Sequence, residues 1–202
     1  MGLREKKAQK VREAIYDAML TLAERDGYDA ATLEQVADRA EVGISTVYRY
    51  FANKDAILLD PIESNVSGLA DLCRTRPDDE DVTVSLGWIV HAILDVGPEY
   101  LARMRRLRAQ LDRAPGPRAR LWDILQRERT LLEDAIAERS GRDPLWNAAA
   151  AHLTIMIITM AHDHDRDSFD ETTPADYADR IIATLHGTGN PLPVRPRQQG
   201  NQ

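Results

Sequence analysis

Helix punctuation recurs along the whole chain, and it constrains the fold more than any other feature of the sequence. Proline suits the first residue of a helix, where its missing N–H is harmless, and such positions are held by Pro98, Pro144 and Pro174. Asp143 and Thr173 precede two of these prolines as N-caps. Glycines end helical patterns at four places, which are Gly27, Gly97, Gly141 and Gly187. Strand-like alternation is lacking in the sequence, so we predict an all-α fold.

Apolar residues recur at helical spacing in nine segments, and we predict a helix in each of them. The predicted helices are residues 4–25, 33–40, 44–51, 54–74, 84–95, 98–113, 118–139, 144–162 and 174–186. Pro61 lies inside the fourth segment and predicts a kink there. Residues 187–202 contain three prolines and no apolar period, so we predict that this tail is disordered.

The charge of the chain is acidic overall but is divided into local blocks. The 202 residues carry a formal net charge of -7, which excludes a wholly basic coat for nucleic acid. Residues 1–12 contain five basic side chains and one acidic side chain, and residues 103–120 contain seven arginines and one aspartate. Residues 163–179 contain seven acidic side chains and one arginine. Any contact with nucleic acid must therefore be local.

The sequence favours a soluble cytoplasmic protein. Cys73 is the one cysteine of the chain, which excludes an internal disulfide and a cysteine-rich zinc site. The most apolar segment, residues 145–161, has 17 residues and is interrupted by polar side chains, whereas a membrane span needs about 20. The polar N-terminus lacks the apolar stretch of a signal peptide. We therefore expect no membrane partner.

Residues 32–51 predict two short helices that cross steeply, as in a helix-turn-helix. Thr32 and Gln35 have the spacing of a capping box at the start of the first helix. The outward face of the second helix carries hydrogen-bonding side chains and no carboxylate, namely Ser45, Thr46, Tyr48, Arg49 and Tyr50. Such a face suits the phosphates and base edges of a nucleic acid. Asn53 is the predicted N-cap of the next helix, and Lys54 at the start of that helix is a candidate phosphate clamp.

The run Thr-Val-Tyr-Arg-Tyr-Phe at 46–51, followed by Asn-Lys-Asp at 53–55, resembles the DNA-binding domain of the TetR family of transcriptional regulators. The resemblance covers about residues 8–60. It implies that Thr32 touches phosphate at a helix N-terminus, that Thr46 and Tyr48 face the groove, and that Tyr50 and Lys54 contact the DNA backbone. The basic N-terminal segment, with Lys6 and Lys7, can reach the backbone or an adjacent groove.

Some positions depart from the family pattern. Glu41 replaces the glycine that usually ends the second helix, and a left-handed conformation costs a non-glycine residue about 1 kcal/mol. Gly43 stands where a serine often caps the recognition helix, and Ser45 stands where glycine is frequent. Glycine is still an acceptable cap. We expect these changes to affect the base preference but not the docking mode.

The second half of the chain carries large apolar and aromatic side chains on several helices, and in the TetR family such helices enclose a pocket for a small effector. The candidate pocket residues are Trp88, His91, Tyr100, Met104, Trp122, Leu125, Met156 and Met160. The alternative for each of them is an ordinary place in the hydrophobic core. No catalytic motif is visible, so we predict no enzyme activity and no cofactor.

Two charged segments of this half have open interpretations. The arginines at 103, 105, 106 and 108 could meet an anionic effector such as the phosphates of an acyl-CoA, form a solvated helix face, or pair with the acidic residues 163–179. Histidine and aspartate alternate from His162 to Asp165. Alternating positions at a helix end converge poorly on one ion, so we predict no metal site.

These observations predict three parts. Residues 1–53 form an N-terminal helix-turn-helix DNA-binding domain, residues 54–186 a helical ligand-binding and dimerisation domain, and residues 187–202 a tail. One helix-turn-helix buries little DNA surface, so we expect a homodimer on a palindromic operator, paired through the last two helices. The predicted function is a ligand-responsive transcriptional regulator, a repressor that a small-molecule effector releases from double-stranded DNA. The alternative is a small-molecule-binding protein or an enzyme that uses the helical pocket and retains a vestigial DNA module.

Overall fold

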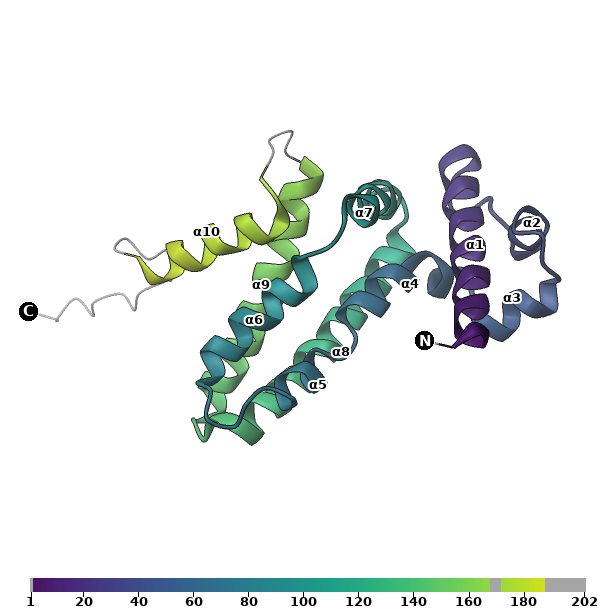
Figure 1. The fold of residues 1–202 in the computed structure, drawn as a ribbon. Helices are drawn as coiled ribbons and strands as arrows, with labels where there is room; N and C mark the ends of the chain where they lie inside the picture. The colour runs from purple at the N-terminus through teal and green to yellow at the C-terminus, as the bar shows by residue number, and fades with distance from the viewer. Residues whose placement is uncertain (1, 168–171, 188–202) are drawn as a thin grey trace, which may run out of the picture.

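The computed structural model describes residues 2–167 and 172–187, and in these residues the chain folds into ten α-helices without a strand (Figure 1). The helices are α1 (Leu3–Asp26), α2 (Leu33–Arg39), α3 (Ile44–Tyr50), α4 (Lys54–Val66), α5 (Leu69–Arg74), α6 (Val82–Leu94), α7 (Pro98–Leu111), α8 (Pro115–Ser140), α9 (Pro144–Asp167) and α10 (Pro174–His186). The predicted all-α class is confirmed. The predicted tail lies outside the described residues.

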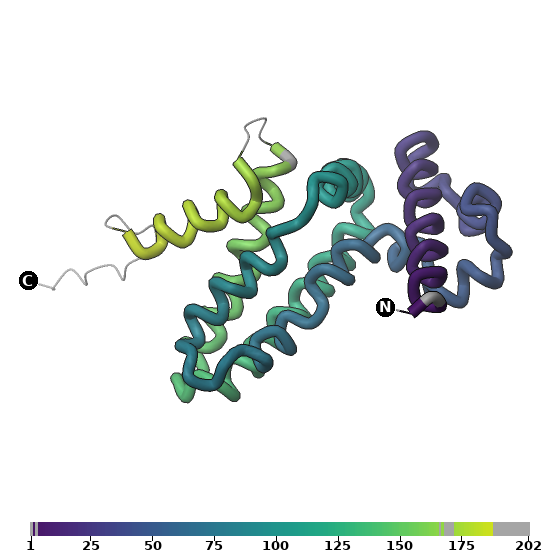
Figure 2. The backbone as a smooth tube through the Cα atoms, in the orientation of Figure 1, coloured from purple at the N-terminus to yellow at the C-terminus, as the bar shows by residue number. Residues whose placement is uncertain are grey.

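The first three helices form one end of the molecule, and α4 leads from them into a larger helical bundle (Figure 2). Their shared core is apolar because each helix turns one stripe inward: Met19 of α1, Val36 of α2 and Val47 of α3 are fully buried. Phe51 is also buried directly after α3, where it ends the helix in an extended conformation. This packing fixes the direction in which α3 presents its outer face.

The single helix predicted over residues 54–74 is in fact two helices, α4 and α5, which explains why ten helices are described where nine were predicted. The chain leaves helical geometry at Ser67, and Gly68 has a φ of +93°, which is costly for residues with a side chain. Pro61 lies inside α4, and the helix continues past it to Val66. The break therefore comes at the glycine rather than at the proline.

The larger bundle is built around α8 and α9, which pack against each other. The helices α5 and α4 pack on α8, whereas α6 and α10 pack on α9. Leu69, Ile89, Leu132 and Ile136 are buried at these contacts. The last helix, α10, extends from the bundle at the end opposite to the first three helices (Figure 1).

Helix α9 is longer than the sequence pattern indicated. Its segment Pro144–Asp165 is long and apolar enough to cross a membrane by length and composition, so the length argument against such a helix was wrong. In this fold α9 packs against α6, α8 and α10, and Ala151, Ile158 and Ala161 are buried there. These contacts are those of a core helix in a bundle.

Candidate nucleic-acid interface and effector cavity

The N-terminus of α2 has the predicted capping box. The backbone N–H of Gln35 donates to the Thr32 hydroxyl over 3.2 Å, and the backbone N–H of Thr32 donates to the Gln35 side chain over 2.9 Å. Thr32 itself remains exposed. Two otherwise unpaired N–H groups are therefore satisfied, and the start of the helix-turn-helix is fixed.

The turn between α2 and α3 retains a left-handed residue although the sequence offers no glycine for it. Glu41 has a φ of +54°, and the N–H of Val42 donates to the carbonyl of Ala37 over 3.0 Å. Gly43 then caps α3 in an extended conformation without a side-chain hydrogen bond. The turn thus has the geometry expected for this motif, at a cost of about 1 kcal/mol at Glu41.

Helix α3 presents a polar outer face that contains no carboxylate. Ser45 and Arg49 are exposed, and 56% of the Tyr48 surface is exposed. Thr46 and Tyr50 are half-buried, and the Arg49 guanidinium lies 5.3 Å from the centre of the Tyr50 ring. Three hydrogen-bonding side chains therefore project together from one short helix, held by the buried Val47 on the opposite side.

Lys54 has a different environment from the one the sequence suggested. Its ammonium donates to the backbone carbonyls of Tyr28, Asp29 and Ala31 over 3.0, 3.3 and 3.1 Å, and it lies 4.5 Å from the centre of the Tyr28 ring. An ammonium has three protons, and these three carbonyls can accept all of them. Lys54 therefore ties the start of α4 to the loop between α1 and α2, an arrangement that leaves it poorly placed to clamp a phosphate.

Two further contacts hold α4, one at its start and one in its middle. The predicted N-cap is present, because the Asn53 side chain accepts from the N–H of Ala56 over 2.9 Å. Arg12 of α1 forms a two-pronged ion pair with the buried Asp60 of α4, and its guanidinium lies 4.9 Å from the centre of the Phe51 ring. Helices α1 and α4 are thus joined where α3 ends.

The basic N-terminal segment is helical. Lys6 and Lys7 are exposed in the first two turns of α1, and the N–H of Gly2 donates to the Glu5 carboxylate over 2.7 Å. These lysines therefore add positive charge at the start of α1 rather than on an extended arm.

A cavity of about 460 Å³ lies between α4, α7, α8 and α9. Four of the eight predicted pocket residues line it: Tyr100, Met104, Trp122 and Leu125. Its wall also includes residues that the sequence patterns did not single out, namely Ile62, Asn65, Val66, Leu111, Leu121, Ile158 and Thr159. For α4, the sequence feature that could have indicated a cavity wall is the polar Asn65 within an apolar stripe.

The other four predicted pocket residues lie elsewhere. The Trp88 ring lies beside the Arg76 guanidinium, 4.4 Å from ring centre to guanidinium carbon. His91 of α6 pairs with Asp179 of α10 at 2.9 Å. Met156 and Met160 line a groove between α9 and α10. Their helical spacing identified them as apolar but could not show which neighbour each one faces.

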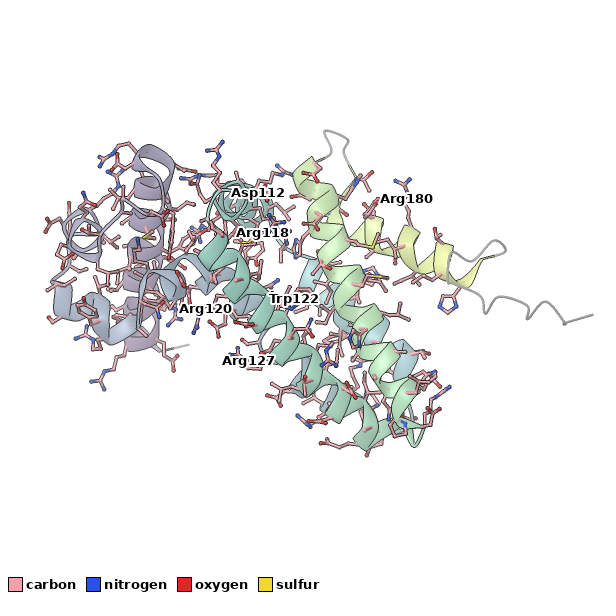
Figure 3. The ribbon with its side chains drawn as sticks, turned by 180° about the vertical axis from the view of Figure 1, so that it is seen from behind. Asp112, Arg118, Arg120, Trp122, Arg127 and Arg180 are labelled. Carbon is pink, nitrogen blue, oxygen red and sulfur yellow. The ribbon has the colours of Figure 1, made fainter. Side chains whose placement is uncertain are left out.

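Charged and polar groups gather on one side of the cavity. Arg108 of α7 donates to Asp163 of α9 over 2.5 Å, and both residues line the cavity. His162 is buried beside them, and burial together with the nearby Arg108 lowers its pKa to about 4. The imidazole is therefore neutral at pH 7. Arg118 and Trp122 lie on the side of α8 that faces α9, opposite to Arg120 (Figure 3).

The arginines of α7 form ion pairs with two neighbouring helices, two with α9 and two with α1. Arg105 and Arg108 pair with Asp165 and Asp163 of α9, so pairing with the acidic segment occurs within one chain. The other two arginines pair with α1: Arg106 with Glu24 at 2.7 Å, and Arg103 with Asp17 at 3.6 Å. A spacing of three residues places each pair of arginines on one side of α7. The helix therefore connects the cavity wall to α1.

The alternating histidines and aspartates of α9 point to different neighbours. The His164 ring stacks on the Tyr177 ring at 3.8 Å, while Asp163 and Asp165 are held by arginines. In the part of the chain that the structure describes, no three histidine, cysteine or carboxylate side chains converge as a metal site would require.

Comparison with known proteins agrees with this geometry. Residues 15–60 match the family described as "Bacterial regulatory proteins, tetR family". The transcriptional regulator TcmR of Streptomyces glaucescens is 28% identical over 152 residues, which are 70% of this chain and 66% of TcmR. The transcriptional repressor KstR of Rhodococcus jostii is 45% identical over 56 residues, which are 27% of this chain and 26% of KstR. The matched segments thus span less than two thirds of either relative.

Solved structures share the fold along most of the chain. The fatty acid degradation regulator FadR of Bacillus halodurans has a TM-score of 0.55 at 18% identity, covering 88% of this chain and 95% of FadR. FadR of Bacillus subtilis, solved in complex with stearoyl-CoA, has a TM-score of 0.53 at 17% identity, covering 86% of this chain and 96% of that one. Residues 15–60 therefore match the tetR family of bacterial regulatory proteins, and the chain shares its fold with these two solved regulators.

Proposed function

We propose that this protein is a transcriptional regulator, a repressor, which reads an operator in double-stranded DNA through α3. The observation that carries the proposal is the outer face of α3, where Ser45, Tyr48 and Arg49 are exposed together and no carboxylate opposes a phosphate. A helix of this size fits the major groove, and such side chains donate to phosphates and base edges. Operator DNA would place the protein in the bacterial cytoplasm.

The DNA proposal is tested by fluorescence anisotropy with a duplex from upstream of the protein's own coding region. Arg49→Gln removes a positive charge from the proposed contact face, and Arg120→Gln removes one from an exposed position on α8. We expect Arg49→Gln to weaken binding by about 1–3 kcal/mol and Arg120→Gln to leave it unchanged. Equal effects of the two substitutions would contradict a contact through α3.

We further propose that two copies pair through α9 and α10. Apolar side chains remain on this face, where Met160 is 41% exposed and Leu145 is 79% exposed. Two apolar grooves of about 340 and 430 Å³ flank α10, and Leu153 and Leu185 line both of them. A second copy would cover these grooves by forming a four-helix bundle, and it would hold two α3 helices at one separation.

The dimer proposal is tested by light scattering after size-exclusion chromatography. Met160→Glu places a charge in one of the two grooves, while Leu131→Glu places the same charge at a similarly exposed leucine of α8 outside them. We expect the Met160 variant to shift towards monomer and the Leu131 variant to remain a dimer. A monomeric unsubstituted protein would contradict the proposal directly.

The cavity between α4, α7, α8 and α9 is the proposed effector site. Two of its walls also touch α1: α4 through the Arg12–Asp60 pair, and α7 through Arg103 and Arg106. A ligand that prefers a different arrangement of these walls would shift α1, and with it α3, away from the separation that DNA requires. We therefore expect a ligand bound in the cavity to release the protein from DNA.

A further inference from the structure

The cavity between α4, α7, α8 and α9 has a wall chemistry that restricts which molecules it can hold. We propose that it selects an uncharged, largely apolar molecule with one or two hydrogen-bonding groups, and that it disfavours anions. The proposal deepens the proposed function, because it takes this cavity as the effector site. Its first support is the apolar part of the wall, where Met104, Leu125 and Ile158 are buried and the Tyr100 ring is half-buried.

The second support is that the charges on the wall cancel. Among the described lining residues, Arg108 and Arg118 are positive, and Asp112 and Asp163 are negative. Arg108 is mostly buried, with 15% of its side chain exposed, and it donates to Asp163 over 2.5 Å. An anion that approached Arg108 would meet this carboxylate beside the guanidinium, and it would gain no net positive charge in return. Placing an uncompensated charge in a largely apolar site is costly.

The third support is the polar side chain that remains available for a neutral partner. His162 lines the cavity beside Arg108 and is 7% exposed. A neutral imidazole offers one donor and one acceptor, which can bind a hydroxyl, carbonyl or amine of a ligand. Asn65 and Thr159 line the same space; the Asn65 amide donates to the Ile93 carbonyl and the Thr159 hydroxyl to the Ile155 carbonyl, so both add oxygen atoms that can accept. The wall therefore recognises hydrogen-bonding groups without requiring a charge.

A matched pair of fluorescent probes tests the charge preference. N-phenyl-1-naphthylamine and 8-anilino-1-naphthalenesulfonate share one aromatic skeleton, and the second carries an added sulfonate. We expect the full chain to bind the neutral probe about tenfold more tightly than the anionic probe. Thr159→Trp and Met104→Trp each place a large side chain in the cavity, so both variants should bind the neutral probe more weakly. A circular dichroism spectrum like that of the unsubstituted protein shows that each variant is folded.

Two aspartate variants make the test sharper. Asp163→Asn removes the partner of Arg108 and leaves the cavity wall with a net positive charge, so affinity for the anionic probe should rise about tenfold while that for the neutral probe stays within twofold. Asp165→Asn is the matched control, because Asp165 lies on the same helix, pairs with Arg105 and is not part of the cavity wall. This control should change neither affinity.

Two outcomes would overturn the proposal. One is that the unsubstituted protein binds the anionic probe as tightly as the neutral probe, and that the tryptophan variants abolish binding of the anionic probe, which would place it in the cavity. The other is an unchanged affinity of Asp163→Asn for the anionic probe. Neither result would affect the DNA proposal, which is tested separately by DNA binding of the unsubstituted protein and of the α3 variants. Conversely, a protein that selects the neutral probe but does not bind DNA would support the cavity and contradict the regulator.

Discussion

The buried histidine of the cavity wall makes the stability of this protein depend on pH in a calculable way. Burial and Arg108 lower the pKa of His162 to about 4, from an ordinary value near 6.5. The folded protein therefore keeps His162 neutral, while the unfolded chain binds a proton below about pH 6.5. Above pH 6.5, His162 is neutral in both states and does not reduce the free energy of unfolding. As the pH falls toward 4, protonation of the unfolded chain lowers the free energy of unfolding. The two pKa values give a loss of about 2 kcal/mol between pH 8 and pH 5.

Urea unfolding of the unsubstituted protein, His162→Gln and His152→Gln at pH 8 and pH 5 isolates this contribution. His152 lies on the same helix but is exposed, and its variant is the matched control for replacing a histidine of α9 by glutamine. The His162 variant should lose about 2 kcal/mol less on acidification, because its side chain does not titrate. Protein concentration must be equal throughout, since pairing of chains affects apparent stability. A pH dependence of His162→Gln within about 0.5 kcal/mol of the unsubstituted protein would show that His162 does not cause the loss of stability at low pH.

Three smaller predictions concern the backbone and Lys54, each checked by thermal or urea unfolding. Glu41→Gly should stabilise the protein by about 0.5–1 kcal/mol, because glycine removes the left-handed strain but loses more entropy on folding; destabilisation would contradict this. Gly68→Ala should destabilise it by about 1–2 kcal/mol, since a φ of +93° strains alanine where no neighbour crowds it. Lys54→Met should cost about 1–3 kcal/mol through three unpaired carbonyls, with the exposed Lys7→Met as the neutral control.

Local sequence patterns were sufficient where a structure depends on residues close together in the chain. The Thr32–Gln35 capping box and the Asn53 cap involve positions three residues apart, and both form as predicted. The left-handed residue lies at Glu41, where the TetR family pattern has a glycine. The polar face of α3 follows from which residues of a short helix must be buried.

Long-range contacts were not accessible in the same way. The partners of Lys54 lie more than 20 residues earlier in the chain, and nothing near Lys54 indicates them. The arginines of α7 look alike in sequence, yet two pair with α9 and two with α1, because helix packing decides which side of α7 each neighbour covers. For the same reason, Trp88 and Tyr100 both fit a pocket pattern, but only Tyr100 of the two lines the cavity.

Hydroxyl-radical footprinting of the upstream DNA reports where two copies of α3 meet the duplex. A dimer that reads DNA through two α3 helices should give two protected patches whose centres lie one helical turn, about 10 base pairs, or a whole multiple of it apart. Tyr48→Ala, which removes the most exposed aromatic side chain of α3, should weaken both patches equally. A folded protein that protects one patch alone, or that leaves the DNA uniformly cleaved, would contradict DNA recognition through two α3 helices.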